Sequence, residues 1–332
     1  MSRILLVAPY PPRACGIGRY AAAQAQRLRR EGHDVAVLSP PDGDGDMRVE
    51  FLGGGAFRTA ARARGFDRVV VHFQPALYFR PRAPLSKVAA AAALWWLCRR
   101  RPEAEILVHE ADPPVRWRPD YLLLRAAFRA APALLFHTDR ERRQLERAYR
   151  IRARARLVSH TDGVQVRAAV PRREARKRLG IPEDETLFVA AGFLHPDKGF
   201  DRAIESFRAV GRGRLAILGS VRERSPRNQA HAARLRELAA STRGVDLVER
   251  YLTDEEFDAW IAAADAVVLP YRRSWSSGVL ARAQALGTPA VVTDVGGLPE
   301  QASGRDVVVR DDDELAAAMA RLAAGRDARV RP

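Results

Sequence analysis

Lys198 lies in the segment of this chain that is best suited to bind an anion. Lysine accounts for only three of the 56 basic residues, and Lys198 precedes Gly199 where a predicted loop leads into a predicted helix. The first amides of a helix lack partners and attract anions, and an adjacent ammonium group adds a full positive charge. The strand before this loop is expected to end at Gly192. We therefore consider Gly192 and Lys198 candidates for holding a phosphate.

Two further turns have the same character. Gly16 and Gly18 stand between a predicted strand and a predicted helix, although Ala21 replaces the third glycine of the dinucleotide-binding pattern. Residues 276–279, Ser-Ser-Gly-Val, begin a later predicted helix, so their hydroxyl and amide groups suit a diphosphate. A pair of glycines at such a position is equally compatible with a tight turn that binds nothing.

Acidic and imidazole side chains supply a second set of candidates. His109 ends a predicted strand and is followed by Glu110 and Asp112, which makes it either a site residue or a structural histidine. Asp residues alternate with glycine over 42–46, but Gly53 stands where a calcium loop needs glutamate. We expect a solvated turn there and no metal site. The acids at 311–314 are expected to cap the last helix.

Short apolar runs alternate with helical segments, as in a parallel sheet that is buried on both faces. The pattern begins with a strand at 3–8, a helix at about 19–30 and a strand at 34–38, and it restarts after a linker-like stretch at 168–177. Further strands are predicted at 69–72, 106–109, 133–136, 156–158, 187–191, 215–219, 245–248, 266–269 and 290–292, with a helix at 200–210.

This pattern predicts an α/β fold of two Rossmann-like, doubly wound domains that face a cleft. We place the first domain at residues 1–165 and the second at 166–332, and we allow for the last helix packing back on the first domain. Ligands of such sheets bind beyond the carboxyl ends of the strands, where the loops named above lie.

Composition excludes several classes of protein. An apolar fraction of 47% excludes a disordered chain, and two cysteines exclude a disulfide scaffold. The chain has no apolar run long enough to span a bilayer, and its first residues have no signal-peptide pattern. We therefore expect a cytoplasmic protein.

Positive charge is concentrated in the first half. Residues 1–165 contain 29 Lys and Arg against 16 Asp and Glu, whereas residues 166–332 contain 27 against 24. Solvated arginines and an acidic partner both explain this excess, while nucleic acid is not expected. In the segment from Tyr78 to Arg101, Arg80, Arg82 and Lys87 precede an alanine-rich, tryptophan-bearing helix. Such a helix suits either peripheral contact with an anionic membrane or burial in the protein core.

Three stretches together resemble retaining glycosyltransferases of family 4. They are the Gly-Ile-Gly turn with the Gly-His-Asp-Val after it, the FLHPDKGFDRAIESF stretch, and the PYRRSWSSGVLARAQALGTPAVVTDVGGLPE stretch. The resemblance implies the GT-B fold and transfer of a sugar from an activated donor to an acceptor hydroxyl, with retention of configuration. It also implies a nucleotide sugar as co-substrate, no other cofactor and no essential metal.

The resemblance assigns roles by position. It implies catalytic roles for His109, beside the donor sugar, and for Lys198, at the departing diphosphate. Donor contacts are implied at Gly16, Gly18, Gly192, Lys198, Tyr251, Leu252, Ser276, Ser277, Gly278, Val279 and Arg282. Tyr10, Arg13 and His72 are expected on the acceptor side.

This chain departs from the family pattern at the donor site. Ser274 and Arg282 stand where the family has two glutamates, and Phe193 replaces an arginine. We expect Arg282 either to weaken ribose binding and favour an extra phosphate or to turn out to solvent. The alternatives to a transferase are a catalytically degenerate binding module and an epimerase or phosphorylase of the same fold.

Overall fold

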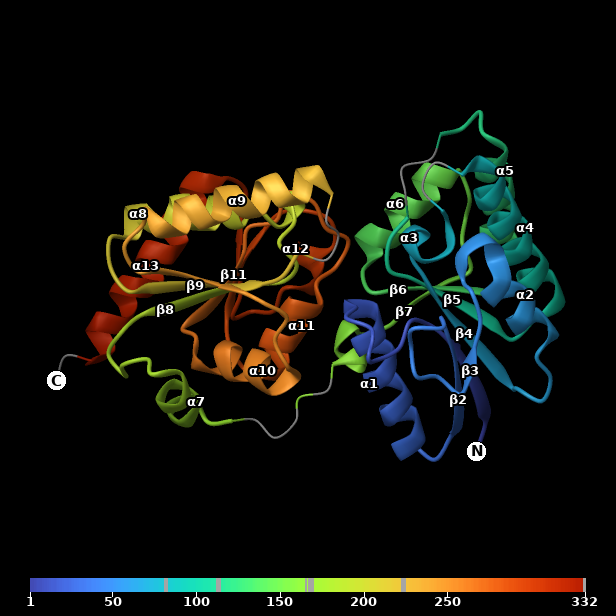
Figure 1. Ribbon diagram of the computed structural model, residues 1–332, viewed down its shortest axis with the longest axis horizontal. Coiled ribbons are helices and arrows are strands. Elements are labelled where there is room, and N and C mark those ends of the chain that lie inside the picture. Colours follow the sequence, from blue (N-terminus) through green and yellow to red (C-terminus); the bar gives the residue numbers. More distant parts are fainter. Residues whose placement is uncertain (81–82, 112–114, 165, 167–169, 222–224, 331–332) are drawn as a thin grey trace. The chain divides into compact units, whose positions relative to one another are not determined.

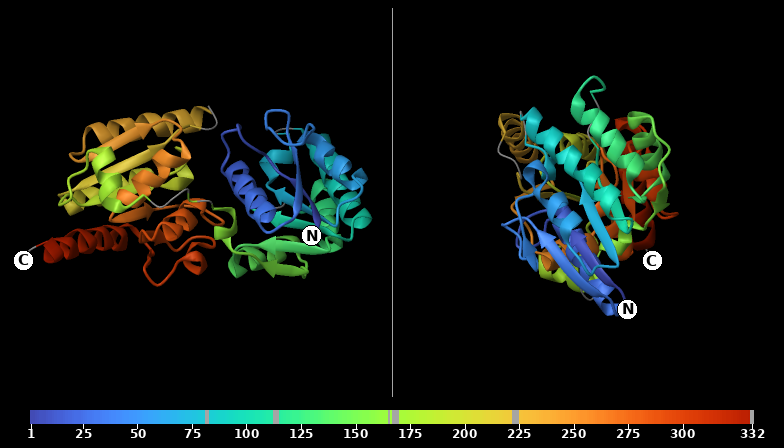
Figure 2. Two further views of the ribbon diagram at one scale, coloured as in Figure 1. Left: turned by 90° about the horizontal axis from the view of Figure 1, so that it is seen from below. Right: turned by 90° about the vertical axis from the view of Figure 1, so that its right-hand side faces the viewer.

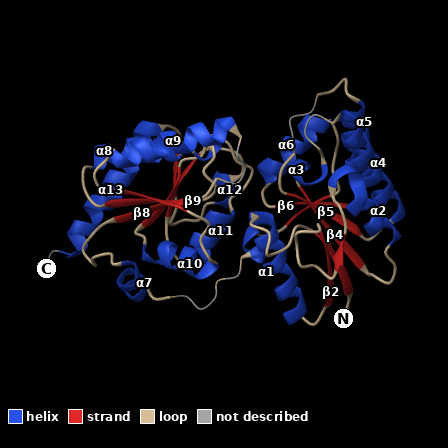
Figure 3. Cartoon of the chain, in the orientation of Figure 1, coloured by secondary structure: helices blue, strands red, loops and turns tan. Residues whose placement is uncertain are grey.

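The computed structural model describes residues 1–80, 83–111, 115–164, 166, 170–221 and 225–330, and side chains up to residue 324. The chain divides into two compact units, residues 1–164 and 165–332. Each unit contains one sheet of parallel strands with helices on both faces, as Figures 1, 2 and 3 show for each unit by itself. The predicted fold of two Rossmann-like α/β domains is therefore confirmed.

The sheet of the N-terminal unit has seven strands in the order β3-β2-β1-β4-β5-β6-β7. The strands are β1 (Arg3–Val7), β2 (Asp34–Ser39), β3 (Met47–Arg48), β4 (Arg68–Phe73), β5 (Ala104–Val108), β6 (Ala133–Phe136) and β7 (Ala155–Leu157). The helices are α1 (Gly16–Arg30), α2 (Gly55–Arg62), α3 (Pro75–Tyr78), α4 (Pro84–Arg100), α5 (Pro119–Ala130) and α6 (Asp139–Tyr149), with short 3₁₀ turns η1 (Leu52–Gly54) and η2 (His160–Gly163). β1 and β4 are neighbours, and the strand order changes direction between them: β2 and β3 are added on one side of β1, and β4 to β7 on the other.

One face of helix α4 is buried in the core of this unit. It packs against α2 and α5 and buries Ala90, Leu94 and Leu97. Trp95 is 40% exposed and Leu85 is 84% exposed. The burial alternative is therefore confirmed for one face of this helix. Arg82, which we predicted to lie before it, falls outside the described residues. Among the helices of the described chain, none is both long and apolar enough to cross a membrane.

The sheet of the C-terminal unit has six strands in the order β10-β9-β8-β11-β12-β13. The strands are β8 (Leu187–Ala191), β9 (Arg214–Gly219), β10 (Val245–Glu249), β11 (Ala266–Leu269), β12 (Ala290–Thr293) and β13 (Val307–Val309). The helices are α7 (Arg172–Leu179), α8 (Phe200–Val210), α9 (Pro226–Ala240), α10 (Asp254–Ala263), α11 (Gly278–Ala285), α12 (Leu298–Gln301) and α13 (Asp312–Val330), with a 3₁₀ turn η3 (Pro196–Lys198).

The last helix packs within its own unit. Leu315, Ala318 and Met319 of α13 join the core cluster that also contains α8 and α9. Whether this helix also packs on the first domain stays a prediction. Its apolar residues pack beside α8. Asp311 accepts a hydrogen bond from the amide of Glu314, so the predicted acidic cap is confirmed.

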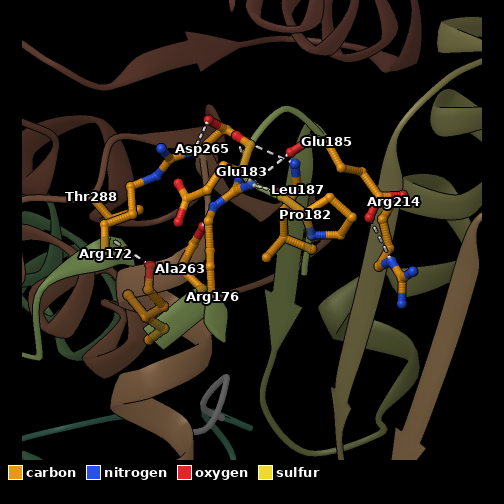
Figure 4. Close-up of polar contacts among 11 residues, drawn as sticks. Arg172, Arg176, Pro182, Glu183, Glu185, Leu187, Arg214, Ala263, Asp265 and Thr288 are labelled. Atoms are coloured by element: carbon orange, nitrogen blue, oxygen red, sulfur yellow. Dashed lines mark hydrogen bonds and ion pairs between the residues drawn. The ribbon is translucent and has the colours of Figure 1, made fainter. Parts of the chain in front are cut away.

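The stretch predicted as a linker at 168–177 is helical from Arg172, because a buried arginine fixes α7 to the sheet. Arg176 has no exposed side-chain surface. Its guanidinium donates to the carbonyl oxygens of Ala263, Pro182 and Glu185 at 2.6–3.0 Å and to Asp265 at 2.8 Å (Figure 4). Asp265 also accepts the amide of Leu187, the first residue of β8. The amino end of β8 is thus held by one cation whose donors are occupied.

Candidate functional site

Four histidines surround one tyrosine at the carboxyl edge of the N-terminal sheet. His72 lies near the end of β4, His109 follows β5, His137 follows β6, and His160 begins the turn after β7. The ring of Tyr20, from α1, lies between 5.3 and 5.7 Å from each of the four imidazole centroids. Because parallel neighbouring strands end at the same edge, one residue from each of four strands converges here.

Hydrogen bonds fix the protonation of two of these rings. The Nε2 atom of His72 lies 2.9 Å from the amide oxygen of Gln24, which can only accept a hydrogen bond. His72 therefore carries its proton on Nε2, and its Nδ1 accepts from Nε2 of His109, also at 2.9 Å. His109 is then left with an unprotonated Nδ1. No described residue donates to that atom, so His109 presents an acceptor to a ligand.

Burial keeps the cluster uncharged. His72 is fully buried, and burial together with the repulsion of His137 lowers its pKa to about 3. Burial likewise lowers the pKa of His137 to about 4 and holds those of His109 and His160 well below the usual range. The pKa of Tyr20 is raised, first by burial and then by Asp162. At neutral pH this surface therefore offers neutral donors and acceptors.

Three buried polar atoms of the cluster have no partner among the described residues: the Tyr20 hydroxyl, Nε2 of His137 and Nδ1 of His160. His137 donates from Nδ1 to the carbonyl oxygen of Val158 at 3.2 Å, so its Nε2 is an acceptor. Unpaired buried donors and acceptors are uncommon and costly. Their mixture of donors and acceptors suits hydroxyl groups of a ligand.

Sequence reasoning identified two of the five residues of this cluster. His109 and His72 were predicted, whereas His137, His160 and Tyr20 were not. The usable signal was the position of each histidine, which falls in or within three residues after a predicted strand. Glu110 accepts a hydrogen bond from the side-chain amide of Gln74 at 3.1 Å. Asp112, the second predicted acid, lies outside the described residues.

The glycine turn before α1 is open on its outer side. The helix begins at Gly16, three residues earlier than expected. A Cβ atom at Gly16 would meet nothing within 4 Å, and one at Gly18 would make only ordinary contacts. Packing inside this unit therefore does not require glycine at Gly16. Arg13 pairs with Asp42 at 3.0 Å, and Tyr10 packs beside the core of β1 and β2.

The Asp-Gly repeat at 42–46 is structural. Asp42 pairs with Arg13, Asp44 pairs with Arg48, and Asp46 accepts the amide of Val37 at 2.8 Å. Across the described residues, no three His, Cys, Asp or Glu side chains form a group that could hold a metal ion.

In the C-terminal unit, Lys198 lies where β8 is followed by η3 and α8. Its ammonium nitrogen sits 3.8 Å from the centroid of the Tyr271 ring. Within the described part of the chain, no carboxylate lies at ion-pair distance from it. Gly199 has φ 63° and approaches the carbonyl oxygen of Pro270 so closely that a Cβ atom would clash. Glycine is therefore required at 199 to carry the chain past β11.

Ion pairs hold the loop that carries Lys198. Arg272 donates to both carboxylate oxygens of Asp201 at 2.7 and 2.8 Å and to the carbonyl oxygen of Pro196 at 3.0 Å. Its own amide donates to the carbonyl oxygen of Asp197 at 2.9 Å. The loop is thus fastened to the segment after β11. Gly192, at φ 141°, also adopts a conformation that other residues rarely reach.

Ser277 is the N-cap of α11. Its hydroxyl accepts the amide of Leu280, its amide donates to the side chain of Gln301 at 2.8 Å, and only 2% of the residue is exposed. The prediction of a helix start is confirmed, but the hydroxyl and the amide of Ser277 are both hydrogen-bonded within the protein. The implied contacts with a diphosphate fall on Ser276, Gly278 and Val279.

Arg282 is the clearest departure from expectation. Its guanidinium binds both oxygens of Asp258 and lies 3.2 Å from Asp254, both on α10, and its side chain is 12% exposed. Burial acts to lower its pKa, but Asp258 outweighs this and raises it. The expectation that Arg282 turns to solvent is wrong, and its charge is not free for an extra phosphate. Tyr251 and Leu252 come just before α10, and Tyr251 is 41% exposed whereas Leu252 is buried.

Sequence comparisons place these features in context. Residues 14–192 match the family described as Glycosyltransferase Family 4, and residues 185–325 match Glycosyl transferases group 1. A D-inositol 3-phosphate glycosyltransferase of Saccharomonospora viridis is 34% identical over 215 residues, which is 58% of this chain and 48% of that protein. One from a Nocardioides species is 35% identical over 51% of this chain and 40% of its own length. The matches therefore span less than half of these relatives.

Solved structures share the fold. Sucrose-phosphate synthase of Thermosynechococcus elongatus has a TM-score of 0.72 at 17% identity, over 98% of this chain and 91% of that one. HepE of Anabaena in complex with UDP-glucose has a TM-score of 0.65 at 13% identity, over 99% of this chain and 94% of that one.

Proposed function

This chain belongs to glycosyltransferase family 4, and on that premise we propose that it transfers a sugar from a nucleotide-diphosphate donor to a hydroxyl group of an acceptor, with retention of configuration. The C-terminal unit takes the donor, and the N-terminal unit takes the acceptor. Two of the resemblances reported above concern proteins whose names contain an inositol phosphate acceptor, and one concerns a complex with UDP-glucose.

The single observation that carries this proposal is the ammonium group of Lys198 at a sheet edge, which pairs with no carboxylate of the described residues. Most buried or half-buried cations of the C-terminal unit are matched by carboxylates, for example Arg272 and Arg282. Lys198 instead rests on the Tyr271 ring, which orients it without neutralising it. A cation held in this way is ready for an anion that forms on the departing diphosphate.

The amides at the start of α11 complete the leaving-group site. Ser277 keeps the helix start rigid, so the amides of Gly278 and Val279 remain for phosphate oxygens. In this proposal Lys198 and those amides, rather than a metal ion, stabilise the charge of the diphosphate. Gly192 lets the chain turn between β8 and Lys198. Ser276 adds a hydroxyl beside the same helix start.

His109 acts by hydrogen bonding. The link from Gln24 through His72 leaves its Nδ1 unprotonated, so it accepts a hydrogen bond from a sugar hydroxyl. Its pKa lies well below neutral, which rules out a role as a protonated acid at pH 7. Around it, Tyr20 and the other imidazoles provide the donors and acceptors that a hydroxyl-rich acceptor needs.

The nucleoside end of the donor is proposed to lie along 250–252, with backbone groups and the exposed Tyr251 contacting the base. Arg282 does not take the place of a ribose-binding glutamate, because Asp258 and Asp254 occupy it. We therefore expect ribose recognition to be weaker than in relatives that keep both acids. Peripheral contact of α4 with an anionic membrane would use its exposed apolar side chains, Leu85 and Trp95.

Titration calorimetry of the full chain against a panel of nucleotides and nucleotide sugars tests the proposal. We expect one nucleotide sugar to bind and to be slowly hydrolysed, with the freed sugar keeping its anomeric configuration by NMR. Inversion would remove the retaining mechanism. Binding without turnover toward any polyol would favour a degenerate binding module, and turnover of a free sugar phosphate would favour a phosphorylase.

A further inference from the structure

Four arginines line a concave surface at the opposite edge of the N-terminal sheet. Arg125 and Arg129 come from α5, and Arg150 and Arg152 follow α6, with Ile151 between them. α5 leads into the amino end of β6, and residues 150–152 lead into the amino end of β7. The four-residue strand β6, about 13 Å long, runs from this edge of the sheet to the edge that carries His137.

The four arginines have no carboxylate at ion-pair distance among the described residues. The acids of the surrounding elements are already paired, as Glu105 with Arg68 and Arg156, Glu146 with Arg142, and Asp120 with Arg118. Within the surface, the one described hydrogen bond runs from Arg125 to the carbonyl oxygen of Arg150 at 3.5 Å. Nε of Arg125 is buried and has no described partner.

The backbone of this region holds the charges close together. Arg125 and Arg129 are one helical turn apart, so their like charges repel each other. Arg150 ends α6 at φ 50° and is the sole described residue other than glycine with positive φ. Glycine or asparagine is usual at this position. Local structure alone therefore gives no reason to gather arginines here.

Arg176 shows how this protein treats an arginine whose role is structural. Near the amino end of β8 in the other unit, its guanidinium donates to three carbonyl oxygens and one carboxylate at 3.0 Å or less. The arginines beside β6 and β7 have almost none of those acceptors. Apart from the bond of Arg125, these guanidinium groups have no acceptor among the described residues and are open to solvent or to a ligand.

We propose that Arg125, Arg129, Arg150 and Arg152 form a binding site for a phosphate group, separate from the glycosyl-transfer site. The planar guanidinium matches phosphate oxygens in pairs and stays charged at any physiological pH. A free phosphorylated compound and a lipid headgroup offer the same group. The proposal does not depend on the proposed transferase activity, because it rests on the amino edge of the sheet and not on the carboxyl edge.

The test compares the full chain with an Arg129→Ser, Arg152→Ser variant and with an Arg30→Ser, Arg64→Ser control. All four side chains are exposed, and both variants lose the same charge. Inorganic pyrophosphate is the free probe, with hydrogen exchange of peptides covering 121–130 and 146–153 as the readout. Co-sedimentation with phosphatidylcholine vesicles, with and without phosphatidylglycerol, is the lipid arm.

We expect pyrophosphate to protect those two peptides in the wild type and in the control. The Arg129, Arg152 variant should need at least about ten-fold more pyrophosphate for the same protection. Protection without sedimentation assigns a free phosphate compound. Sedimentation with phosphatidylglycerol that is lost only in the Arg129, Arg152 variant assigns a lipid headgroup. If this variant matches the control in both arms, or if pyrophosphate protects only peptides near Lys198, the proposal is wrong.

Discussion

The carboxyl edges of the two sheets carry side chains of different charge. In the N-terminal unit, four imidazoles and a phenol lie together without charge, because burial lowers the histidine pKa values. In the C-terminal unit, Arg272 and Arg282 are matched by carboxylates, whereas Lys198 rests on an aromatic ring. The same doubly wound layout therefore carries a neutral surface suited to hydroxyl groups and a charged surface suited to a phosphate.

This difference also concerns how each unit keeps polar side chains buried. The C-terminal unit buries ions in pairs, which makes each partner indispensable to the other. The N-terminal unit buries neutral rings linked by hydrogen bonds, which makes it sensitive to protonation. Loss of one ion-pair partner should therefore destabilise the C-terminal unit, and acid should destabilise the N-terminal unit.

The largest effect is expected from breaking the pair in the C-terminal unit. Arg282→Met leaves the carboxylate of Asp258 buried and unpaired, so we expect a loss of about 3–5 kcal/mol in the free energy of unfolding. Urea unfolding followed by circular dichroism measures it. The double variant Arg282→Met, Asp258→Leu should recover most of the loss. A double variant as unstable as the single one would show that the pair itself is not the cause.

Lys198→Ala tests the charged edge by activity. On the proposed role of Lys198 at the leaving diphosphate, we expect kcat to fall by about 100-fold, or about 3 kcal/mol, with folding intact. Lys177→Ala, on the exposed side of α7, is the matched control and should keep wild-type turnover. Steady-state turnover of the nucleotide sugar identified by calorimetry gives both values. Equal rates for the two variants would remove Lys198 from the mechanism.

Acid should destabilise the neutral edge. His72 has a pKa of about 3 in the folded protein, against about 6.5 when unfolded, so the unfolded state binds its proton first. Its contribution to stability is complete above pH 6.5 and decreases as the pH falls toward 3. At pH 5 the loss is about 2 kcal/mol. Thermal unfolding of the wild type and of His72→Asn between pH 7 and 5 measures it, and equal slopes would contradict this account.

The smallest effect concerns the link through Gln24. Gln24→Leu removes the acceptor that fixes the proton on Nε2 of His72, so His109 loses its preferred protonation. We expect about a five-fold fall in kcat, or about 1 kcal/mol, from one neutral hydrogen bond. Gln24→Glu keeps an acceptor and should retain more activity than Gln24→Leu. The reverse order would show that the side chain only fills space.

Periodicity predicted most of the framework, because buried parallel strands leave continuous apolar runs. The strand at 266–269 and the helix at 200–210 match the structure at both ends. The strand β3 was missed because two residues paired with the end of β2 leave no periodic pattern. α7 was missed because its sequence is nearly all charged, and what holds it is the buried Arg176.

The site was less predictable than the framework. Family resemblance named Lys198 and His109 as candidates, but no local pattern shows that His137 and His160 lie beside His109. Their proximity depends on the order β4-β5-β6-β7, which only the assembled sheet reveals. Arg282 was misjudged for a related reason. Its partners Asp254 and Asp258 are more than twenty residues away, on a helix that packs against α11.

Arg176 provides a probe for local opening of the C-terminal unit. Its Nε proton is bonded to the carbonyl oxygen of Ala263 and has no solvent-facing side-chain surface. Exchange of that proton with deuterium requires α7 to leave the amino end of β8. The exchange rate of this one proton therefore reports how often α7 opens, and a bound nucleotide that stabilises the unit should slow the exchange.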